Sequence, residues 1–246
     1  MTTLFGSLWS TRTAGRAAAA EVKRITLTQV FFTGFHGLPF VTAAALVIGA
    51  TMMIQIAVAA PGLPGEIVGQ ILVAVLLREL APLVTAIIVA SRSGTAIATE
   101  LGNMQAGMEL HGLASLGIDP LRYVVFPRIT AVVVSVLVLT VYFSVLAIAG
   151  TIAIAIILGS PSISAVRSGL GAALQFEDFG LYAAKGVGCG VIVGWLCCFF
   201  GLQVRSSPTE VPLNSARAVI RSVLSCVVFN FAVTVAYYAW VGTPGG

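Results

Sequence analysis

Charged residues are scarce in this chain of 246 residues, since Asp, Glu, Lys and Arg together account for 9% of it. A soluble domain typically carries about 25% charged residues, so this chain cannot cover a globular surface with ionic side chains. The composition also excludes a disordered chain, a nucleic-acid-binding module and a disulfide-stabilised scaffold. Because 58% of the residues are hydrophobic, we expect a single domain that lies in a membrane.

Residues suited to metal or nucleophilic chemistry are also few. All four cysteines lie in apolar runs without C-x-x-C spacing: Cys189, Cys197, Cys198 and Cys226. They are typical of small buried hydrophobic residues, not of metal ligands or disulfides. His36 and His111 are solitary, and Ser91 and Ser93 have no His or Asp at a recognisable spacing. The sequence therefore predicts neither a metal site nor an intramembrane hydrolase.

The N-terminal segment (1–38) contains no apolar run long enough to cross a bilayer, and basic residues interrupt it. No signal peptide fits, because no basic end leads directly into a short apolar core with a cleavage site. Apolar anchors such as Leu4, Leu8 and Phe35 beside these basic residues favour a helix in the membrane interface. A frayed cytoplasmic tail is the alternative.

Long apolar runs dominate the rest of the chain. A bilayer crossing needs about 20 apolar residues, and five segments qualify: roughly 39–60, 67–90, 129–158, 181–201 and 218–241. We therefore predict an all-α membrane protein, with an N-terminal interfacial helix followed by five transmembrane helices in a domain of residues 39–246. Five spans without an internal repeat count against a self-contained secondary transporter.

The basic residues predict the orientation of these spans. Of the 13 Lys and Arg residues, we place ten in the N-terminal tail and the connections near 91–128 and 202–221. The other two connections hold Arg167 alone, while Arg78 and Lys185 lie within spans. Since cytoplasmic connections carry the excess of basic residues, we expect the N-terminus in the cytoplasm and the C-terminus outside.

In the fourth predicted span, Gly186, Gly190 and Gly194 recur every four residues. This small-xxx-small spacing lets another helix approach closely.

The connection at 91–128 combines a helical period with turn signals. Its apolar residues recur at spacings of four, three and four, which is one face of a helix: Ile97, Leu101, Met104 and Met108. Asp119-Pro120 is expected to stop or turn the chain, and Pro127-Arg128 to mark its return into the membrane. A connector that lies on the membrane surface fits this pattern as well as a docking helix does.

The strings LLRELAPLVTAIIVASRSGTAIATELGNMQAGMEL and LGIDPLRYVVFPR resemble the permease subunits of MlaE/YrbE-type ABC transporters, which accompany MCE proteins in bacterial lipid transport. The resemblance covers roughly residues 40–240 and continues through a lysine in the fourth span to SARAVIRSVL. It implies a location in the bacterial inner membrane. It also implies an assembly with a second permease, identical or paralogous, two cytoplasmic ABC ATPases and an MCE-domain protein outside.

On this resemblance, the 91–128 connection supplies a cytoplasmic coupling helix between spans two and three, which docks into the ATPase. The residues that would carry the coupling are Glu100, Met104, Met108, Glu109, Asp119 and Pro120. The chain has no G-x-x-x-x-G-K-[ST] motif, so ATP and magnesium are expected on the partner ATPase and no cofactor on this chain.

Charged residues also interrupt the second span. Arg78 lies about eleven residues from either end of the predicted span, where a charge costs roughly 2.5–3.5 kcal/mol and needs a partner or water. Neighbouring helix positions do not face each other, so Arg78 and Glu79 need not pair. Pro82 removes the amide that would bond the carbonyl of Arg78, which predicts a kink and a free acceptor. These residues either border a transport path or hold the bundle together through other helices.

Lys185 lies near the start of the fourth span, from where its side chain can reach the outer interface. The resemblance instead favours a functional role, because the family pattern places a lysine at this point. Separately, it matches Glu79 to a glutamate that is among the polar residues near the transport path. Family members often have an aspartate in the last span where this chain has Asn230, which leaves a hydrogen-bonding group without charge. The predicted intramembrane polar site is therefore Arg78, Glu79, Pro82, Lys185 and Asn230.

A lipid path needs a tall apolar wall with few polar groups. Flexible methionines and one amide toward the outer end of the first span suit it, with leucines of the second span opposite. The predicted lining residues are Met52, Met53, Gln55, Ile56, Leu76 and Leu80. Ordinary packing is the alternative for each. The resemblance places the lipid cavity between two permeases, formed largely by these two spans.

The sequence thus favours a permease subunit, not itself an enzyme, that moves phospholipid or a related lipid between the inner membrane and an MCE carrier. A non-transporting scaffold that anchors envelope proteins is the competing hypothesis. An ion-coupled carrier is a third, disfavoured by the unrepeated five spans.

Overall fold

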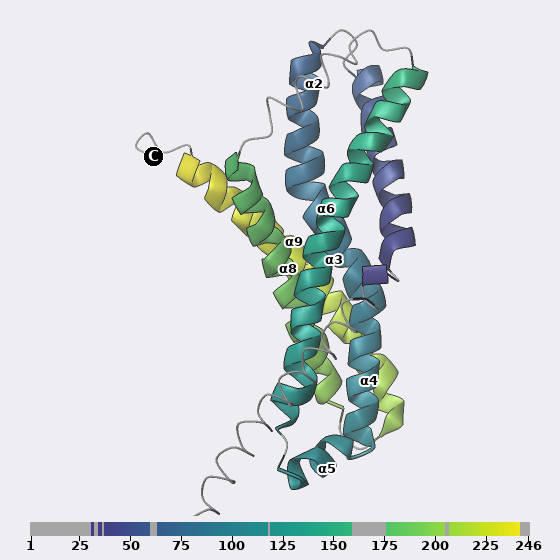
Figure 1. The fold of residues 1–246 in the computed structure, drawn as a ribbon, viewed down its shortest axis with the longest axis vertical. Coiled ribbons are helices and arrows are strands. Elements are labelled where there is room, and N and C mark those ends of the chain that lie inside the picture. The colour runs from purple at the N-terminus through teal and green to yellow at the C-terminus, as the bar shows by residue number, and fades with distance from the viewer. Residues whose placement is uncertain are drawn as a thin grey trace, which may run out of the picture.

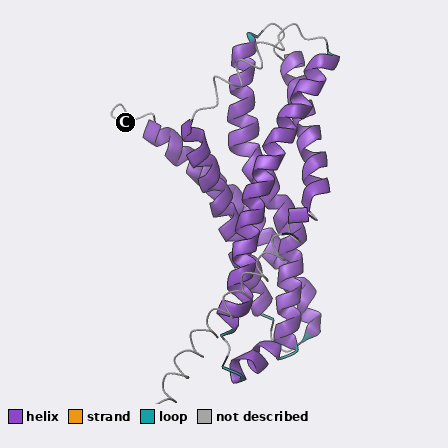
Figure 2. Cartoon of the chain, in the orientation of Figure 1, coloured by secondary structure: helices purple, strands orange, loops and turns teal. Residues whose placement is uncertain are grey.

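The computed structural model describes residues 31, 34–35, 37–59, 63–117, 119–158, 176–204 and 207–241. In this part of the chain every regular element is a helix and no strand occurs, which confirms the all-α prediction (Figure 2). Five helices are long and apolar enough to cross a membrane, as predicted: Gly37–Ala59, Glu66–Ala106, Tyr123–Ile157, Gly180–Leu202 and Val211–Ala239. Most of the predicted interfacial helix falls in residues 1–30, outside the described residues.

The elements follow one another as an up-and-down bundle (Figure 1). After the first span (Gly37–Ala59) come α2 (Gly65–Ile71), the π-helical η1 (Leu72–Leu80), α3 (Ala81–Val89), the π-helical η2 (Ala90–Gly94) and α4 (Thr95–Ala106). Then follow α5 (Glu109–Ser115), the π-helical η3 (Leu121–Val125), α6 (Phe126–Ile157), α8 (Phe176–Leu202), the 3₁₀ turn η4 (Pro208–Glu210) and α9 (Val211–Val241). In Figure 1, α8 and α9 diverge from α2 and α6 toward the end where α2 begins, and α5 crosses the opposite end.

Two of the π-helical segments precede a proline. Pro82 follows η1 and Pro127 follows η3. Proline has no N–H for the carbonyl four residues earlier, and widening the helix lets carbonyls bond an amide five residues on. At the end of η1, the amide of Ala81 does so with the carbonyl of Leu76. The backbone irregularity predicted at Pro82 therefore takes the form of a π-helical turn.

The second long helix extends past the predicted end of the second span. It continues beyond residue 90 to Ala106, which at 1.5 Å per residue makes it about 60 Å long. The apolar face that predicted a separate helix is buried, since Ile97 and Leu101 are 1% and 0% exposed where α4 packs on α8 and α9. At Ile97 and Leu101 the helical period therefore reflects packing within the bundle, and these two residues do not lie on a membrane surface.

Asp119-Pro120 begins the third long helix. The stop and turn that the sequence predicted here lie just before it, where α5 ends at Ser115 and the chain turns at Leu116 and Gly117. The carboxylate of Asp119 accepts a hydrogen bond from the amide of Leu121 at 3.0 Å, and the helix runs on from Pro120. An acidic cap followed by proline at the first helical position favours a helix N-terminus. The third long helix thus begins before Pro127-Arg128, where we expected the chain to return into the membrane.

Glycines set the closest contact between α8 and α6. A Cβ atom on Gly190 would lie 2.7 Å from the Cα of Val133, and one on Gly194 would lie 3.1 Å from that of Ile129. Gly186 meets the side chain of Leu137 in the same way. This confirms that the glycine spacing marks a close helix–helix approach.

Hydroxyl groups supply further bonds between the helices. Thr85 of α3 bonds Thr140 of α6 at 2.7 Å, and Thr151 of α6 donates to the carbonyl of Gly49 in the first span at 3.1 Å. Lipid is as apolar as the hydrophobic side chains of the helices, so burying these side chains does not drive association. Close packing and hydrogen bonds therefore hold the helices together.

Candidate functional site

Lys185 of α8 lies at the centre of a polar cluster inside the bundle. Its side chain is 0% exposed. Its Nζ donates to the Oε1 of Glu79 at 2.8 Å, to the backbone carbonyl of Arg78 at 3.0 Å and to the Oγ1 of Thr234 at 2.7 Å. An ammonium group has three donors, and each has a partner here. The side chain therefore does not extend to the outer interface, the alternative that the sequence left open.

Glu79 of η1 is bound from three sides. Besides the ammonium of Lys185, its Oε1 accepts the hydroxyl of Thr234 at 2.8 Å, and its Oε2 accepts the amide of Asn230 at 2.7 Å. One third of its side chain is exposed, although that of Lys185 is not. The ion pair is therefore reached from outside through the carboxylate.

Pro82 accounts for the backbone contact of the cluster. The sequence predicted that the missing amide of Pro82 frees the carbonyl of Arg78, and the ammonium of Lys185 donates to this carbonyl. Arg78 thus contributes its backbone carbonyl to the cluster, and its neighbour Glu79 contributes a carboxylate. Residues 78 and 79 contribute different groups to one site.

Asn230 suits this cluster better than an aspartate would. Its Nδ2 donates to the carboxylate of Glu79, a bond that an ionised aspartate cannot make. The Lys185–Glu79 pair then balances one positive with one negative charge. The acid that faces the lysine is therefore in the second span, and the last span supplies neutral polar groups.

Thr234 belongs to the cluster but was missed by the sequence analysis. It lies four residues after Asn230 on α9 and on the same helix face, and it bonds both Lys185 and Glu79. The sequence signal was a second polar residue at i+4 within an apolar span.

The residues predicted to line a lipid path fall into two groups. Met52, Gln55 and Ile56 line an open groove of about 200 Å³ beside Leu63 and Ile71. Met53 and Leu76 are instead buried, at 4% and 1% exposed, and the partly buried Leu80 packs against the same core. The structure thus places half of the set at a surface that a ligand can reach.

The residues predicted to couple to an ATPase are also divided. Glu100 of α4 forms an ion pair with Arg128 of α6 at 2.7 Å, and the same guanidinium lies 3.9 Å from the sulfur of Met104. Arg128, which the sequence placed only at the return of the chain into the membrane, is 6% exposed. This pair holds α4 to α6.

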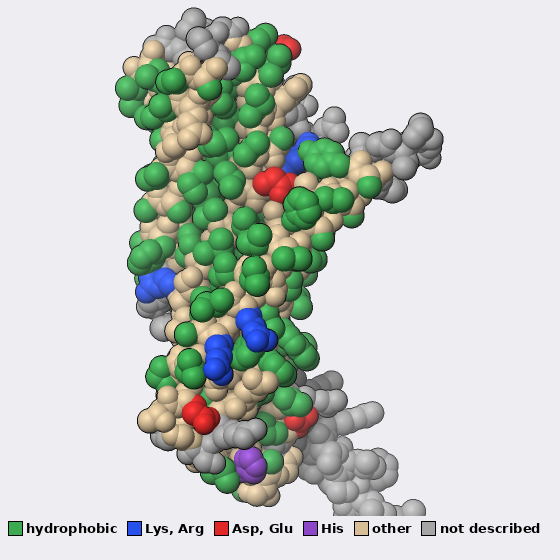
Figure 3. Space-filling model, turned by 180° about the vertical axis from the view of Figure 1, so that it is seen from behind, with side chains coloured by type: hydrophobic (Ala, Val, Ile, Leu, Met, Phe, Trp, Pro, Cys, Tyr) green, Lys and Arg blue, Asp and Glu red, His purple; other side chains and the backbone are tan. Residues whose placement is uncertain are grey.

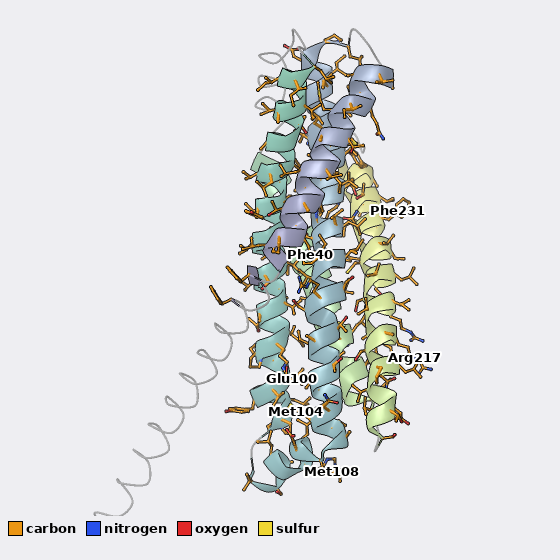
Figure 4. The ribbon with its side chains drawn as sticks, turned by 90° about the vertical axis from the view of Figure 1, so that its right-hand side faces the viewer. Phe40, Glu100, Met104, Met108, Arg217 and Phe231 are labelled. Carbon is orange, nitrogen blue, oxygen red and sulfur yellow. The ribbon has the colours of Figure 1, made fainter. Side chains whose placement is uncertain are left out.

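The other members of that set lie at the tip of the hairpin between the second and third long helices. Met108 and Glu109, at the start of α5, are exposed, and Figure 4 shows Met108 at this end of the molecule. Met108 has a φ of 59°, so the left-handed turn that redirects the chain into α5 is made by a non-glycine residue. Asp119 and Pro120 begin the returning helix. The tip is therefore distinct from the Glu100–Arg128 contact.

Comparison with known proteins places this arrangement in a family. Residues 26–236 match the family described as Permease MlaE. The chain is 28% identical over 233 residues to the intermembrane phospholipid transport system permease protein MlaE of Haemophilus influenzae, covering 94% of this chain and 87% of that protein. It is 26% identical over 211 residues to a probable ABC transporter permease protein of Rickettsia typhi, with 85% and 82% covered.

A chloroplast protein of Arabidopsis thaliana, TRIGALACTOSYLDIACYLGLYCEROL 1, is 27% identical over 175 residues, which are 71% of this chain and 50% of that protein. The family match includes the whole polar cluster and reaches into all five long helices. This chain is therefore a multi-pass membrane protein and belongs to the MlaE permease family.

Proposed function

We propose that this chain is the permease subunit of an ABC transporter that moves phospholipid or a related lipid, driven by a separate ATPase. The match to the MlaE permease family over residues 26–236 carries this proposal. The name of the Haemophilus relative, a phospholipid transport permease, supports lipid as the substrate. The ion pair inside the bundle adds a physical argument, because charges within membrane spans are costly and usually functional.

The exposed tip around α5 is the proposed ATPase contact. Three large apolar side chains are exposed there, Met108, Leu116 and Leu121, beyond the end of the 41-residue second helix. Apolar side chains that lie outside the bilayer and remain exposed mark a protein interface. The coupling surface is thus the hairpin tip, and the Glu100–Arg128 pair makes the hairpin rigid enough to transmit force.

The polar cluster is the proposed point at which this force changes the spans. It ties η1 to α8 and α9 through Glu79, Lys185 and Thr234. Beyond the cluster α8 and α9 diverge from α2 (Figure 1), and Figure 3 shows the molecule hollowed on this side. We propose that the cluster sets the width of this divergence, where lipid passes toward an MCE-domain partner.

The proposed location is the bacterial inner membrane, with the hairpin tip in the cytoplasm and α9 ending on the outer side. The excess of basic residues in the connections on the side of α5 supports this orientation. A second permease, identical or paralogous, completes the assembly, and ATP with magnesium is bound by the ATPase.

Reconstitution tests the proposal. The chain is purified with its ATPase and MCE partners, placed in proteoliposomes, and assayed for ATP-dependent transfer of a fluorescent phospholipid. We expect transfer that stops when the ATPase is inactivated by mutation. Partners that assemble fully yet transfer no lipid on ATP addition would contradict transport and favour the scaffold hypothesis. Transfer without any ATPase would indicate an ion-coupled carrier.

A further inference from the structure

Two arginines lie on the outer face of α9. Arg217 and Arg221 are four residues apart, which places them on the same side of the helix, and both are exposed. Figure 4 shows Arg217 projecting away from the other helices. The guanidinium of Arg221 lies 5.3 Å from the centroid of the Phe200 ring, against α8. These two side chains form an exposed basic patch at the edge of the apolar face of α9.

The patch has no acidic partner within the described residues. No carboxylate of a described residue lies within 4.0 Å of Arg217 or Arg221, in contrast to Arg128, which pairs with Glu100, and Lys185, which pairs with Glu79. As far as the described residues go, both guanidinium groups therefore keep N–H donors for an added anion.

The length of α9 indicates how deep in the membrane these two arginines lie. Tyr238 lies 21 residues after Arg217, which at 1.5 Å per residue is about 31 Å along the helix. The hydrocarbon core is about 30 Å thick, and tyrosines favour its boundary. With Tyr237 and Tyr238 at one boundary, Arg217 lies at the other and Arg221 lies about 6 Å further in. An unpaired guanidinium at this depth needs an anion.

The hairpin tip lies well beyond this level. Ser215, two residues before Arg217, bonds Thr99 of α4 at 2.9 Å. From Thr99 the helix continues for seven residues to Ala106, about 10 Å, before α5 begins. The arginines are thus on the membrane side of the proposed ATPase contact, which favours a lipid over a protein as their ligand.

We propose that Arg217 and Arg221 bind the phosphate of an anionic phospholipid in the leaflet on the α5 side of the membrane. A guanidinium binds phosphate through paired N–H donors, which gives the site its geometry. One apolar row continues from the patch along α9, with Ile220, Leu224 and Val228 each more than 60% exposed. Acyl chains of the bound lipid lie along this row.

Native mass spectrometry of the full-length permease, purified without partners, measures this binding directly. Phosphatidylglycerol is titrated against phosphatidylcholine with the same acyl chains. A basic residue near a membrane surface strengthens binding of anionic lipid about fivefold. We therefore expect phosphatidylglycerol to bind more tightly, and Arg217→Gln/Arg221→Gln to weaken it about thirtyfold.

Two further variants separate the site from general charge effects. Arg92→Gln removes a positive charge from η2, where the guanidinium lies 4.4 Å from the centroid of the Phe40 ring, and we expect little change in lipid binding. Arg217→Lys/Arg221→Lys keeps both charges and should retain most of it. Equal binding of the two lipids would overturn the proposal, as would an unchanged double glutamine variant or an equal loss in Arg92→Gln. Because no ATPase is present, failure here leaves the transport proposal standing.

Discussion

Neutralising Glu79 tests whether the intramembrane ion pair holds the second span against α8. Glu79→Gln keeps the size of the side chain but leaves the ammonium of Lys185, which is 0% exposed, without a counter-charge. Removing one partner of a buried pair costs about 3–5 kcal/mol. Because a third of the Glu79 side chain is exposed, water screens part of the attraction. We therefore expect the free energy of unfolding to fall by about 3 kcal/mol.

The reverse change should cost less. In Lys185→Met the carboxylate of Glu79 keeps the amide of Asn230 and the hydroxyl of Thr234, and water can reach it. We expect a loss of about 1–2 kcal/mol. In Glu79→Gln/Lys185→Met neither charge of the pair remains, so the double variant should return to within about 1 kcal/mol of wild type.

Unfolding in mixed micelles, followed by circular dichroism as the fraction of SDS is raised, gives these free energies. Glu66→Gln, which neutralises an exposed carboxylate on α2, serves as the matched control and should stay within about 0.5 kcal/mol of wild type. A double variant that loses the sum of the two single effects would refute the pairing. Equal losses in the two single variants would refute the argument from burial.

Three other substitutions follow from contacts described above. Gly190→Leu forces side-chain atoms against Val133 and should lower the free energy of unfolding by about 1–3 kcal/mol. Gly180→Leu is the control and should not lower it, because a Cβ atom on Gly180 would have nothing within 4 Å. Similar losses in the two variants would contradict the close approach of α8 and α6. Thr140→Val removes the hydroxyl bonded to Thr85 and should cost about 0.6 kcal/mol in the same titration, and a loss above about 2 kcal/mol would indicate a larger network. Glu100→Lys sets a cation beside Arg128 and should lower the melting temperature by several degrees. Glu109→Lys on exposed α5 should leave the melting temperature unchanged but weaken recovery of the ATPase in a pull-down. If Glu100→Lys instead weakened ATPase recovery and Glu109→Lys lowered the melting temperature, the coupling surface would lie at Glu100.

Helical periodicity located helices well but misjudged what their faces contact. The row at Ile97 and Leu101 predicted a helix correctly, yet its environment was wrong, because a face against lipid, a membrane surface or another helix is apolar in the same way. The continuous helix to Ala106 was missed for a related reason. Arg92 and Gly94 indicated a loop, but both are compatible with a helix where α8 and α9 pack against this stretch.

Local chemistry was readable without the fold. Scarce charge and long apolar runs determined a helical membrane protein with five spans, since backbone polar groups in lipid must bond within their own helix. The glycines of α8 and the carbonyl that Pro82 frees are likewise properties of short stretches of chain, and the structure bears both out.

Which groups meet was decided by tertiary structure. Lys185 pairs with Glu79, 106 residues away, and Glu79 with Asn230, 151 residues away. The burial of Arg128 against Glu100 and the location of Met53 and Leu76 inside the core likewise depend on which helices pack together. In an apolar solvent, packing and a few polar bonds determine these neighbours. The sequence shows which hydrogen-bonding and charged groups are present, but not which of them meet in the fold.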